Sequence, residues 1–298
     1  MRQEAAYPAV QSICREYNVS SISRMCAIAG IARASYYKWL NREIPEAELL
    51  NEAIAEAVMS IHKEYPDKGH RRIRDDLLRD CGFDVSDRRV LRICRIPGIK
   101  STIKYERNSC TVNAKDPQHI SENILKRNFR ADAPNEKWLT DVTEFKYYEG
   151  SEKRKVYLSA VLDLYDRRIV AYVIGEGNSN PLVYDTFKKA VSSYPDAHPL
   201  FHSDRGFQYT NAVFHEMLTE HGMTQSMSGA GKCIDNGPIE GFRGILKREC
   251  YYGKRFESRE DIVDMIESYI YYYNNRRYQR QLGVVTPIEK YEQYLSAA

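Results

Sequence analysis

Three carboxylates stand in distinctive settings along this chain: Asp141 in WLTDVTEF, Asp204 in FHSDRGFQY and Glu240 in DNGPIEGFRGILK. Asp204 and Glu240 have 35 residues between them, and Lys247 follows Glu240 by seven. Hard divalent cations prefer oxygen ligands, and two such cations can hold both the attacking and the leaving oxygen of an in-line phosphoryl displacement. The pattern therefore indicates cutting or joining of a nucleic-acid backbone.

Each carboxylate also has an ordinary explanation when it is taken alone. An aspartate near a strand end often serves in a turn or a cap, and a single glutamate on a helix usually belongs to a solvated face. Two observations favour a functional site instead. Asp141 interrupts an apolar run, where an unpaired carboxylate is costly to bury, and Asp204 stands in a dense polar cluster directly after the apolar residues 199–201.

The second half of the chain has the pattern of an α/β domain. From Trp138 onward, short apolar or alternating runs predict three strands, a helix, a strand, a helix, a strand and two more helices. This order is typical of a mixed sheet flanked by helices. Asp141 then lies on the first strand and Asp204 at the end of the fourth, and the ends of neighbouring strands are where a site is expected.

The segment DNGP predicts the start of the helix that carries Glu240, because proline is favoured at the first helical position. At 3.6 residues per turn this helix has two different faces. One face is apolar and consists of Ile239, Phe242, Leu246 and Cys250, whereas the other consists of Glu240, Arg243, Lys247 and Tyr251. We expect the second face to present Glu240 to a metal ion and Lys247 to a phosphate.

The first half of the chain is basic and helical. Residues 1–130 carry 23 Lys and Arg against 17 Asp and Glu. Two short helices are predicted around Gly30, and a second pair on either side of Gly82, with Ser86 as the N-cap of a helix over 87–95. A glycine-containing turn between short helices is typical of helix-turn-helix DNA-binding units, although a plain αα-hairpin explains the first pair equally well.

Basic side chains concentrate on the second pair of helices. Residues 68–107 include 12 Lys and Arg but only 6 Asp and Glu. The helix over 87–95 has a basic stripe of Arg88, Arg89, Arg92 and Arg95, and a buried side of Val90, Leu91 and Ile93. A solvated helix surface can look the same, but the coincidence with the helix-turn-helix pattern favours contact with phosphates.

Four segments follow from these patterns. Residues 1–45 are predicted to form a helix-turn-helix region, and residues 46–107 a second, basic helix-turn-helix-like region. Residues 108–133 are predicted to be a linker with one short helix over 121–129, since they contain Pro117 and lack strong periodicity at their start. Residues 134–298 are predicted to form the α/β core together with C-terminal helices.

The motifs WLTDVT, HSDRGFQY and DNGPIEGFRGILKRE closely resemble the integrase-type catalytic core of bacterial transposases of the insertion-sequence-three group, specifically the product of their second reading frame. The resemblance covers most of the chain. ARASYYKWL and the segment from HRRIRDDLL to VSDRRVLRI are similar to the helix-turn-helix regions of that group, and NNRRYQRQLGVVTPIEKY is similar to its C-terminal signature.

This resemblance implies a ribonuclease-H-like fold, a mixed five-stranded sheet flanked by helices, in which Asp141, Asp204 and Glu240 bind Mg²⁺ or Mn²⁺, two ions per active site. It implies that water attacks at the end of the element to expose a 3′-OH, and that this hydroxyl then attacks a target phosphodiester without a covalent protein–DNA intermediate. His202, Ser203 and Asn236 are expected beside the ligands, although hydrogen bonding to nearby backbone explains them equally well.

DNA contacts are expected on both the core and the helical regions. The residues are Lys247, Arg243, Arg71, Arg72, Arg88, Arg89, Arg92, Tyr36 and Lys38. Arg243 departs from the related proteins, which often have an aromatic residue three positions after the glutamate. A cation there can pair with Glu240 or grip DNA, and we expect the second because a metal-bound Glu240 has little charge left to share.

The expected partners are double-stranded DNA, both the terminal repeats of the element and the target, and further copies of the same chain, because two ends must be held together for joining. Related transposases are often fused to the product of an upstream frame, and the sequence does not reveal whether this one is. Two alternatives stay open: a metal-dependent nuclease without strand transfer, and a DNA-binding regulator with an inactive core.

Cysteine and histidine spacing excludes a zinc knuckle, because there is no CxxC and no histidine pair near a cysteine pair. The sequence also has no signal-peptide pattern and no apolar run of about 18 residues. We expect a cytoplasmic, nucleoid-associated protein without membrane contact. The terminal-repeat sequence, the target preference and the oligomer size cannot be deduced from these residues.

The arginine stripe leads to a first prediction. DNA affinity should fall steeply as the salt concentration rises, because each phosphate that is neutralised releases counterions, with a slope of log affinity against log salt of about −0.9 per phosphate. Fluorescence anisotropy with a labelled duplex over a salt series measures this slope. A flat dependence would mean that the stripe does not touch phosphates.

Overall fold

The computed structural model describes residues 3–17, 21–103, 117–229 and 233–297. These residues form two compact units, Met1–Ala57 and Val58–Ala298. Within the described ranges, none of the helices combines the length and the apolar character needed to cross a membrane.

The first unit is a small helical cluster made of α1 (Gln3–Glu16), α2 (Ile22–Ile28), α3 (Arg33–Leu40) and the first part of α4 (Glu46–Glu64). Gly30 has φ +67° between α2 and α3, a left-handed conformation that glycine adopts without strain. The predicted pair of helices around Gly30 is confirmed. Tyr36 is only 2% exposed and packs in the core of this unit with Val10 of α1. The prediction that Tyr36 contacts DNA is therefore wrong, because its ring is buried in the hydrophobic core of this unit and is not accessible to a phosphate or a base.

The second unit begins with the rest of α4 and continues with α5 (His70–Arg79) and α6 (Asp87–Arg95). Ser86 caps α6 as predicted, since its Oγ accepts a hydrogen bond from the Arg89 backbone N–H at 3.3 Å. Val90 and Ile93 are buried, whereas Leu91 is only half-buried.

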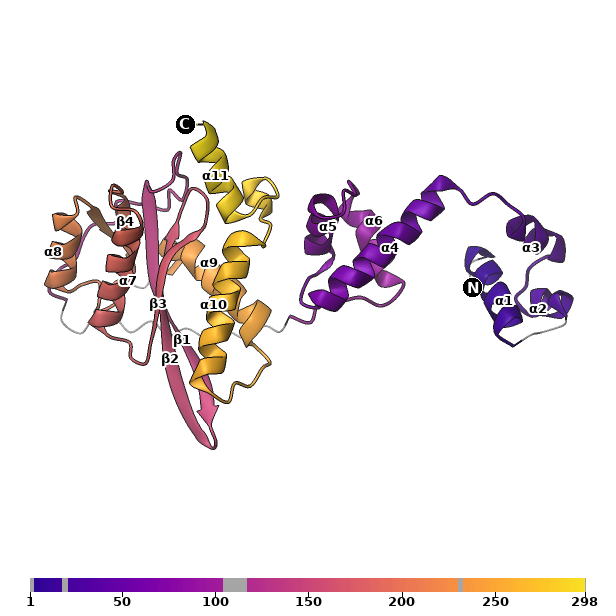
Figure 1. Cartoon of the computed structure of the whole chain (residues 1–298), viewed down its shortest axis with the longest axis horizontal. Helices are drawn as coiled ribbons and strands as arrows, with labels where there is room; N and C mark the ends of the chain where they lie inside the picture. The colour runs from indigo at the N-terminus through magenta and orange to yellow at the C-terminus, as the bar shows by residue number, and fades with distance from the viewer. Residues whose placement is uncertain (1–2, 18–20, 104–116, 230–232, 298) are drawn as a thin grey trace. The chain divides into compact units, whose positions relative to one another are not determined.

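A mixed five-stranded sheet forms the centre of the second unit (Figure 1). Its strands are β1 (Lys137–Glu149), β2 (Glu152–Asp163), β3 (Ile169–Gly175), β4 (Leu200–Ser203) and β5 (Thr224–Met227), with α7 (Asn180–Ser193) before β4 and α8 (Ala212–Glu220) before β5. The strand order is β3-β2-β1-β4-β5, antiparallel through β1, β2 and β3, and parallel from β1 to β4 and β5. The mixed sheet and the predicted order of strands and helices are confirmed as far as the two helices after β5, and a third helix that was not predicted, α11 (Pro287–Ala297), follows them.

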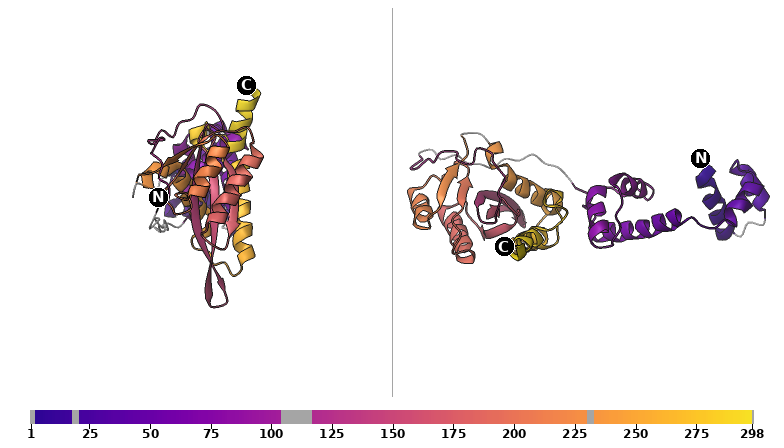
Figure 2. Two further views of the ribbon diagram at one scale, coloured as in Figure 1. Left: turned by 90° about the vertical axis from the view of Figure 1, so that its left-hand side faces the viewer. Right: turned by 90° about the horizontal axis from the view of Figure 1, so that it is seen from above.

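Helices cover both faces of this sheet (Figure 2). On one face α9 (Gly237–Leu246) and α10 (Arg259–Asn275) pack, and on the other α7 and α8. The alternation along β1 decides which residue meets which layer. Trp138 lies among Phe187 of α7 and Phe201 of β4, while Leu139 lies among Ile239 and the other apolar residues of α9 and α10. This double coverage makes β1 a buried strand at the centre of the core.

Residues 117–129, which we call the strap, lie along β5 and are not helical. Met227 donates its backbone N–H to Glu122 O at 3.2 Å, and Leu125 is buried in the core. The predicted short helix over 121–129 is therefore wrong, because part of this segment bonds to β5 and its own backbone bonds, such as Asn128 N–H to Leu125 O at 2.8 Å, form only isolated turns. Part of the predicted linker 108–133 thus packs on the core, and its first residues lie outside the described ranges.

An ion-pair network joins α5 to the C-terminal part of the second unit. Glu249, in the π-helical turn η2 (Lys247–Tyr251), is 6% exposed at its side chain and pairs with Arg72 at 3.0 Å and Arg277 at 2.8 Å. The Tyr269 hydroxyl donates to Glu249 at 2.8 Å, and that of Tyr272 accepts from Arg72 at 2.8 Å. The charge of Arg72 is compensated by carboxylates inside the chain, which argues against the predicted contact of Arg72 with DNA.

A second set of contacts joins both helices of this pair to the turn η3 (Arg280–Leu282). Arg280 donates to Asp75 of α5 at 2.9 Å and to Asp87, in the first turn of α6, at 2.8 Å. The position of α6 therefore depends on the C-terminal region as well as on its own turn.

The second prediction concerns Glu249. Burial by itself disfavours its charged form, but the neighbouring Arg277 and Arg72 outweigh burial and lower the pKa of Glu249 below its usual range. Glu249→Gln should leave half-buried Arg277 without its counter-charge and Arg72 with Asp67 alone, and should lower the free energy of unfolding by about 3–5 kcal/mol. Urea unfolding followed by circular dichroism measures the loss. Glu257→Gln is the control, because Glu257 is 80% exposed and its ion pair with Arg255 spans 3.9 Å. Equal stability of the two variants would contradict the prediction.

Candidate active site

The three predicted carboxylates come from three adjoining elements. Asp141 lies within β1, Asp204 directly follows β4, and Glu240 lies in the first turn of α9. β1 and β4 are parallel neighbours with Leu139 opposite His202, so Asp141 and Asp204 stand two residues further along at the same end of the pair. The fold therefore brings residues that are 63 and 36 positions apart in sequence to one place.

Burial and mutual repulsion dominate the electrostatics of this place. Desolvation raises the pKa of Asp141 to about 7, with the negative charges of Asp204 and Glu240 adding to the rise and Arg243 opposing it. Burial also raises the pKa of Asp204, against a hydrogen bond from Gly206 N and the charge of Arg243, and it raises the pKa of Glu240. The carboxylates are therefore near enough to one another for each negative charge to destabilise its neighbours.

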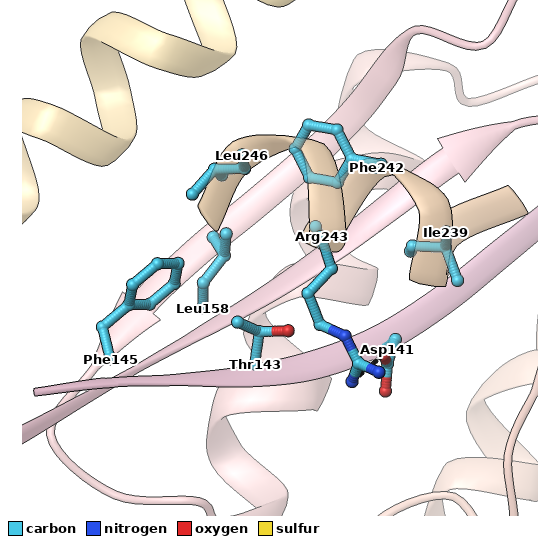
Figure 3. Close-up of a pocket in the computed structure, with 9 residues that line it drawn as sticks. Asp141, Thr143, Phe145, Leu158, Ile239, Phe242, Arg243 and Leu246 are labelled. Atoms are coloured by element: carbon cyan, nitrogen blue, oxygen red, sulfur yellow. Dashed lines mark hydrogen bonds and ion pairs between the residues drawn. The ribbon is translucent and has the colours of Figure 1, made fainter. Parts of the chain in front are cut away.

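Arg243 is the cation that faces this cluster. Its side chain runs from α9 across to β1, and its Nη1 donates to Asp141 Oδ2 at 2.7 Å (Figure 3). The same two residues lie at one end of a hollow between β1, β2 and α9 whose other lining side chains, such as Thr143 and Phe242, carry no charge. We expected Arg243 to grip DNA rather than pair with Glu240. The structure instead pairs it with another carboxylate of the triad, Asp141.

The donor set suits a hard cation by chemistry, since the charges of half-buried Asp204 and Glu240 disfavour the charge of buried Asp141, and a dication would relieve that repulsion. In their present positions, however, no three His, Cys, Asp or Glu side chains of the described residues are close enough together to hold a metal ion. Asp141 Oδ1 accepts from Val142 N at 2.9 Å, and Asp204 Oδ1 accepts from Gly206 N at 2.8 Å. Metal coordination by the triad therefore requires side-chain rotation and stays a proposal.

His202 is fully buried beneath Asp204, and its hydrogen bonds determine its tautomer. Ser226 Oγ already accepts the backbone N–H groups of Ile124 at 3.0 Å and Leu125 at 3.1 Å, so its own proton goes to His202 Nδ1, 2.8 Å away. His202 Nε2 then carries the ring proton and donates to Ser228 Oγ at 3.1 Å. Desolvation lowers the pKa of His202 to about 4 despite the nearby charge of Asp235, which keeps the ring neutral.

Ser203 and Asn236 bond to the backbone beside the triad. Ser203 Oγ donates to Asp204 O at 2.9 Å, and Asn236 Nδ2 donates to Thr140 O at 3.0 Å. Asn236 thereby joins the start of α9 to the residue before Asp141. Asp235 was missed in the sequence, although it stands next to Asn236 in the same motif and is buried.

The remaining predicted DNA contacts divide into exposed and buried side chains. Lys247 is buried, with its ammonium 5.1 Å from the centroid of the Phe145 ring, so its charge is not presented to a phosphate as we predicted. In contrast, the side chains of Arg71, Arg88, Arg92 and Lys38 are exposed, and that of Arg89 is half-buried. DNA binding by this second group stays a prediction.

Comparison with known families supports the architecture described above. Residues 131–233 and 240–295 each match a family model described as an integrase core domain, and residues 49–107 match an HTH-like domain. A solved structure of the HTLV-2 integrase catalytic core domain in complex with magnesium aligns with a TM-score of 0.41 and 19% identity, covering 54% of this chain and 99% of that one.

Curated relatives match most of the chain. An uncharacterized transposase-like protein of Haemophilus influenzae is 39% identical over 71% of this chain and 95% of its own length. The putative transposase InsK for insertion sequence element IS150 of Escherichia coli is 37% identical over 74% of this chain and 76% of its own length. The transposase InsF for insertion sequence IS3A of Escherichia coli is 29% identical over 91% of this chain and 94% of its own length.

A ribonuclease-H-like integrase core, preceded by an HTH-like domain and matched by insertion-sequence transposases, defines a DDE polynucleotidyl transferase that acts on DNA as a transposase. The chain belongs to the IS3 family of bacterial insertion-sequence transposases.

The third prediction separates the two possible roles of Arg243. Arg243→Ala should raise the affinity for Mn²⁺ about threefold to tenfold, because it removes the cation that now occupies Asp141 Oδ2. Isothermal titration of the protein without DNA measures this change, and anisotropy with an end duplex tests DNA binding. Arg255→Ala is the control, since Arg255 lies in an exposed ion pair with Glu257. Unchanged Mn²⁺ affinity together with lost DNA binding would instead support our original expectation that Arg243 grips DNA.

Proposed function

We propose that this transposase cleaves DNA at the ends of its insertion sequence and transfers the resulting 3′-OH to target DNA, in a reaction that depends on divalent metal ions. The observation that carries the proposal is the meeting of Asp141, Asp204 and Glu240 from β1, the end of β4 and α9, where Asp141 is buried, the other two are half-buried, and the charges of Asp204 and Glu240 raise the pKa of Asp141. Gathering three like charges in a partly desolvated place is unfavourable unless a cation compensates them.

In this proposal the three carboxylates hold two Mg²⁺ or Mn²⁺ ions. Such ions, when bound, activate the attacking oxygen and stabilise the leaving oxygen of a phosphodiester. Asp141 must be ionised and must release Arg243 before its carboxylate can serve as a ligand. Because its pKa is raised to about 7, the ionised form predominates only from neutral pH upward, and ligation should weaken below that pH.

The reaction that fits this site is one displacement carried out twice. Water attacks at the end of the element, and the 3′-OH of the cleaved strand then attacks the target. Joining conserves the number of phosphodiester bonds, so the reaction needs no external energy source. Among the groups that flank the triad, neutral His202 holds the end of β4, and Asn236 holds the start of α9 against β1.

DNA binding is assigned to the exposed basic side chains of the helical regions, namely Lys38, Arg71, Arg88 and Arg92, together with half-buried Arg89. Exposed arginines on a capped helix can reach phosphates without disturbing the core. The chain is proposed to act as an oligomer, because two DNA ends must be held in one complex for joining. A fusion with, or partnership of, an upstream-frame protein is compatible with this scheme.

The fourth prediction tests the reaction. Purified protein is incubated with an oligonucleotide that carries the terminal repeat of the element and with Mg²⁺, and cleaved and joined products are separated on a sequencing gel. Asp141→Asn, Asp204→Asn and Glu240→Gln should each lower both products by about 10³-fold or more, because each removes a charged ligand. Glu144→Gln is the matched control, since Glu144 lies on the same strand in ion pairs with Lys146 and Lys155.

Two outcomes would contradict the proposal in different ways. Cleavage by the wild-type protein without joining under varied conditions would support a metal-dependent nuclease. DNA binding with neither product would support a regulator with an inactive core.

A further inference from the structure

Asp235 is a buried carboxylate that the reaction scheme leaves without a role. It lies in the short turn η1 (Cys233–Asn236), directly before α9, and its carboxylate accepts hydrogen bonds from three donors. Arg127 Nε donates to its Oδ1 at 2.6 Å, while Asn123 Nδ2 at 2.9 Å and Gly229 N at 3.0 Å donate to its Oδ2. Two of these donors are strap side chains, more than 100 residues away in sequence.

The strap presents these two side chains in a defined way. Arg127 has φ 63° and Lys126 has φ 45°, left-handed conformations that non-glycine residues rarely adopt, and they turn the chain at this point. Asn123 Oδ1 accepts the Lys126 backbone N–H at 2.8 Å, which leaves the amide group of Asn123 pointing to Asp235. Such conformations persist only where the surrounding contacts favour them.

The strap itself is attached to the sheet that carries the site. His119 donates its backbone N–H to Thr210 O at 2.9 Å, and the backbone N–H of Leu125 donates to Ser226 Oγ at 3.1 Å. Ser226 also bonds to His202. His202 in turn lies two positions before Asp204 in the chain. The strap is therefore held by Thr210, shortly before α8, and by β5, and is a fixed support for Asp235.

The other side of the turn is held by β1. Asn236, next to Asp235, donates from Nδ2 to Thr140 O at 3.0 Å, and Thr140 precedes Asp141. Glu240 follows Asn236 by four residues, about one helical turn. The start of α9 is thus held between the strap on one side and the catalytic strand on the other.

We propose that Arg127 and Asn123 are positioning residues of the active site: through Asp235 they fix the start of α9, so that Glu240 meets Asp141 and Asp204. The inference rests on the proposed role of Glu240 as a ligand. Neither strap residue touches the reacting atoms. Their effect passes through the turn η1, and loosening that turn should displace Glu240 while leaving the sheet, and hence the two aspartates, in place.

The test uses the full chain with three variants. Arg127→Met removes the donor and keeps much of the side-chain length, Arg127→Lys keeps the charge, and Arg130→Met is the control because Arg130 is 88% exposed and pairs only loosely with Asp132 at 3.6 Å. Four quantities are measured: the single-turnover cleavage rate at saturating DNA, the half-saturating Mg²⁺ concentration, the affinity for end DNA in Ca²⁺, and the melting temperature.

Arg127→Met should lower the cleavage rate about 10- to 100-fold and raise the half-saturating Mg²⁺ concentration, with DNA affinity unchanged, because supporting residues around a metal site have effects of this size. Arg127→Lys should recover part of the rate, and Arg130→Met should match the wild-type protein. All assays are run well below the melting temperature of every variant, where the unfolded fraction is negligible, because partial unfolding would by itself raise the half-saturating Mg²⁺ concentration.

Three results would overturn the inference. One is a wild-type rate for Arg127→Met, and another is a lower rate with an unchanged Mg²⁺ requirement that follows the loss of folded protein. The third is weakened DNA binding with an unchanged Mg²⁺ requirement, which would make Arg127 a DNA contact instead. Glu240→Gln separates this inference from the proposed function: full activity of Glu240→Gln defeats the proposed function, whereas an inactive Glu240→Gln beside a fully active Arg127→Met defeats only the positioning role.

Discussion

The gathering of three carboxylates at one end of the central sheet, one buried and two half-buried, is the constraint on which this protein depends. Desolvation raises the pKa of each of them, repulsion between carboxylates adds to the rise for Asp141 and Glu240, and the pKa of Asp141 reaches about 7. A fold that maximised stability alone would not collect these charges, because apolar residues of similar volume pack there at less cost. The ion pair with Arg243 offsets part of the repulsion. A site of this kind is stable enough to form and still favours the binding of further positive charge.

The helical layers on both faces of the sheet hold the backbone around these carboxylates in place despite their repulsion. β1 is covered on both faces, by Phe187 and its neighbours on one side and by Ile239 and its neighbours on the other. Because both layers are close-packed, the backbone at Asp141 has little freedom to move away from Asp204. Glu240 is different, since it comes from a helix whose start is held by side-chain hydrogen bonds rather than by a strand ladder. The position of Glu240 therefore depends on the hydrogen bonds of the turn before α9, which is where the proposed positioning residues act.

The basic helical pair is tied to the core by charged contacts. Arg280 joins Asp75 and Asp87, and Glu249 joins Arg72 and Arg277. Buried and networked ion pairs of this type define relative position more than they add stability. The consequence for DNA recognition is that some arginines that look available in the sequence are already used within the chain.

The sequence by itself determined the order of the strands and helices up to α10, the N-cap at Ser86 and the apolar face of α9, and it singled out the three carboxylates that are the proposed ligands, because hydrophobic periodicity, capping and motif spacing are local properties. It could not separate the roles of individual basic or aromatic residues. Tyr36, Arg72 and Lys247 are residue types that often contact DNA, yet each packs or forms an ion pair or cation–π contact inside the fold. The segment 121–129, predicted as a helix, instead forms hydrogen bonds to β5. Only tertiary structure decided the pairing of Arg243 with Asp141 and of Arg127 with Asp235, since these contacts join residues more than 100 positions apart, and no local pattern encodes which distant charge a side chain will meet.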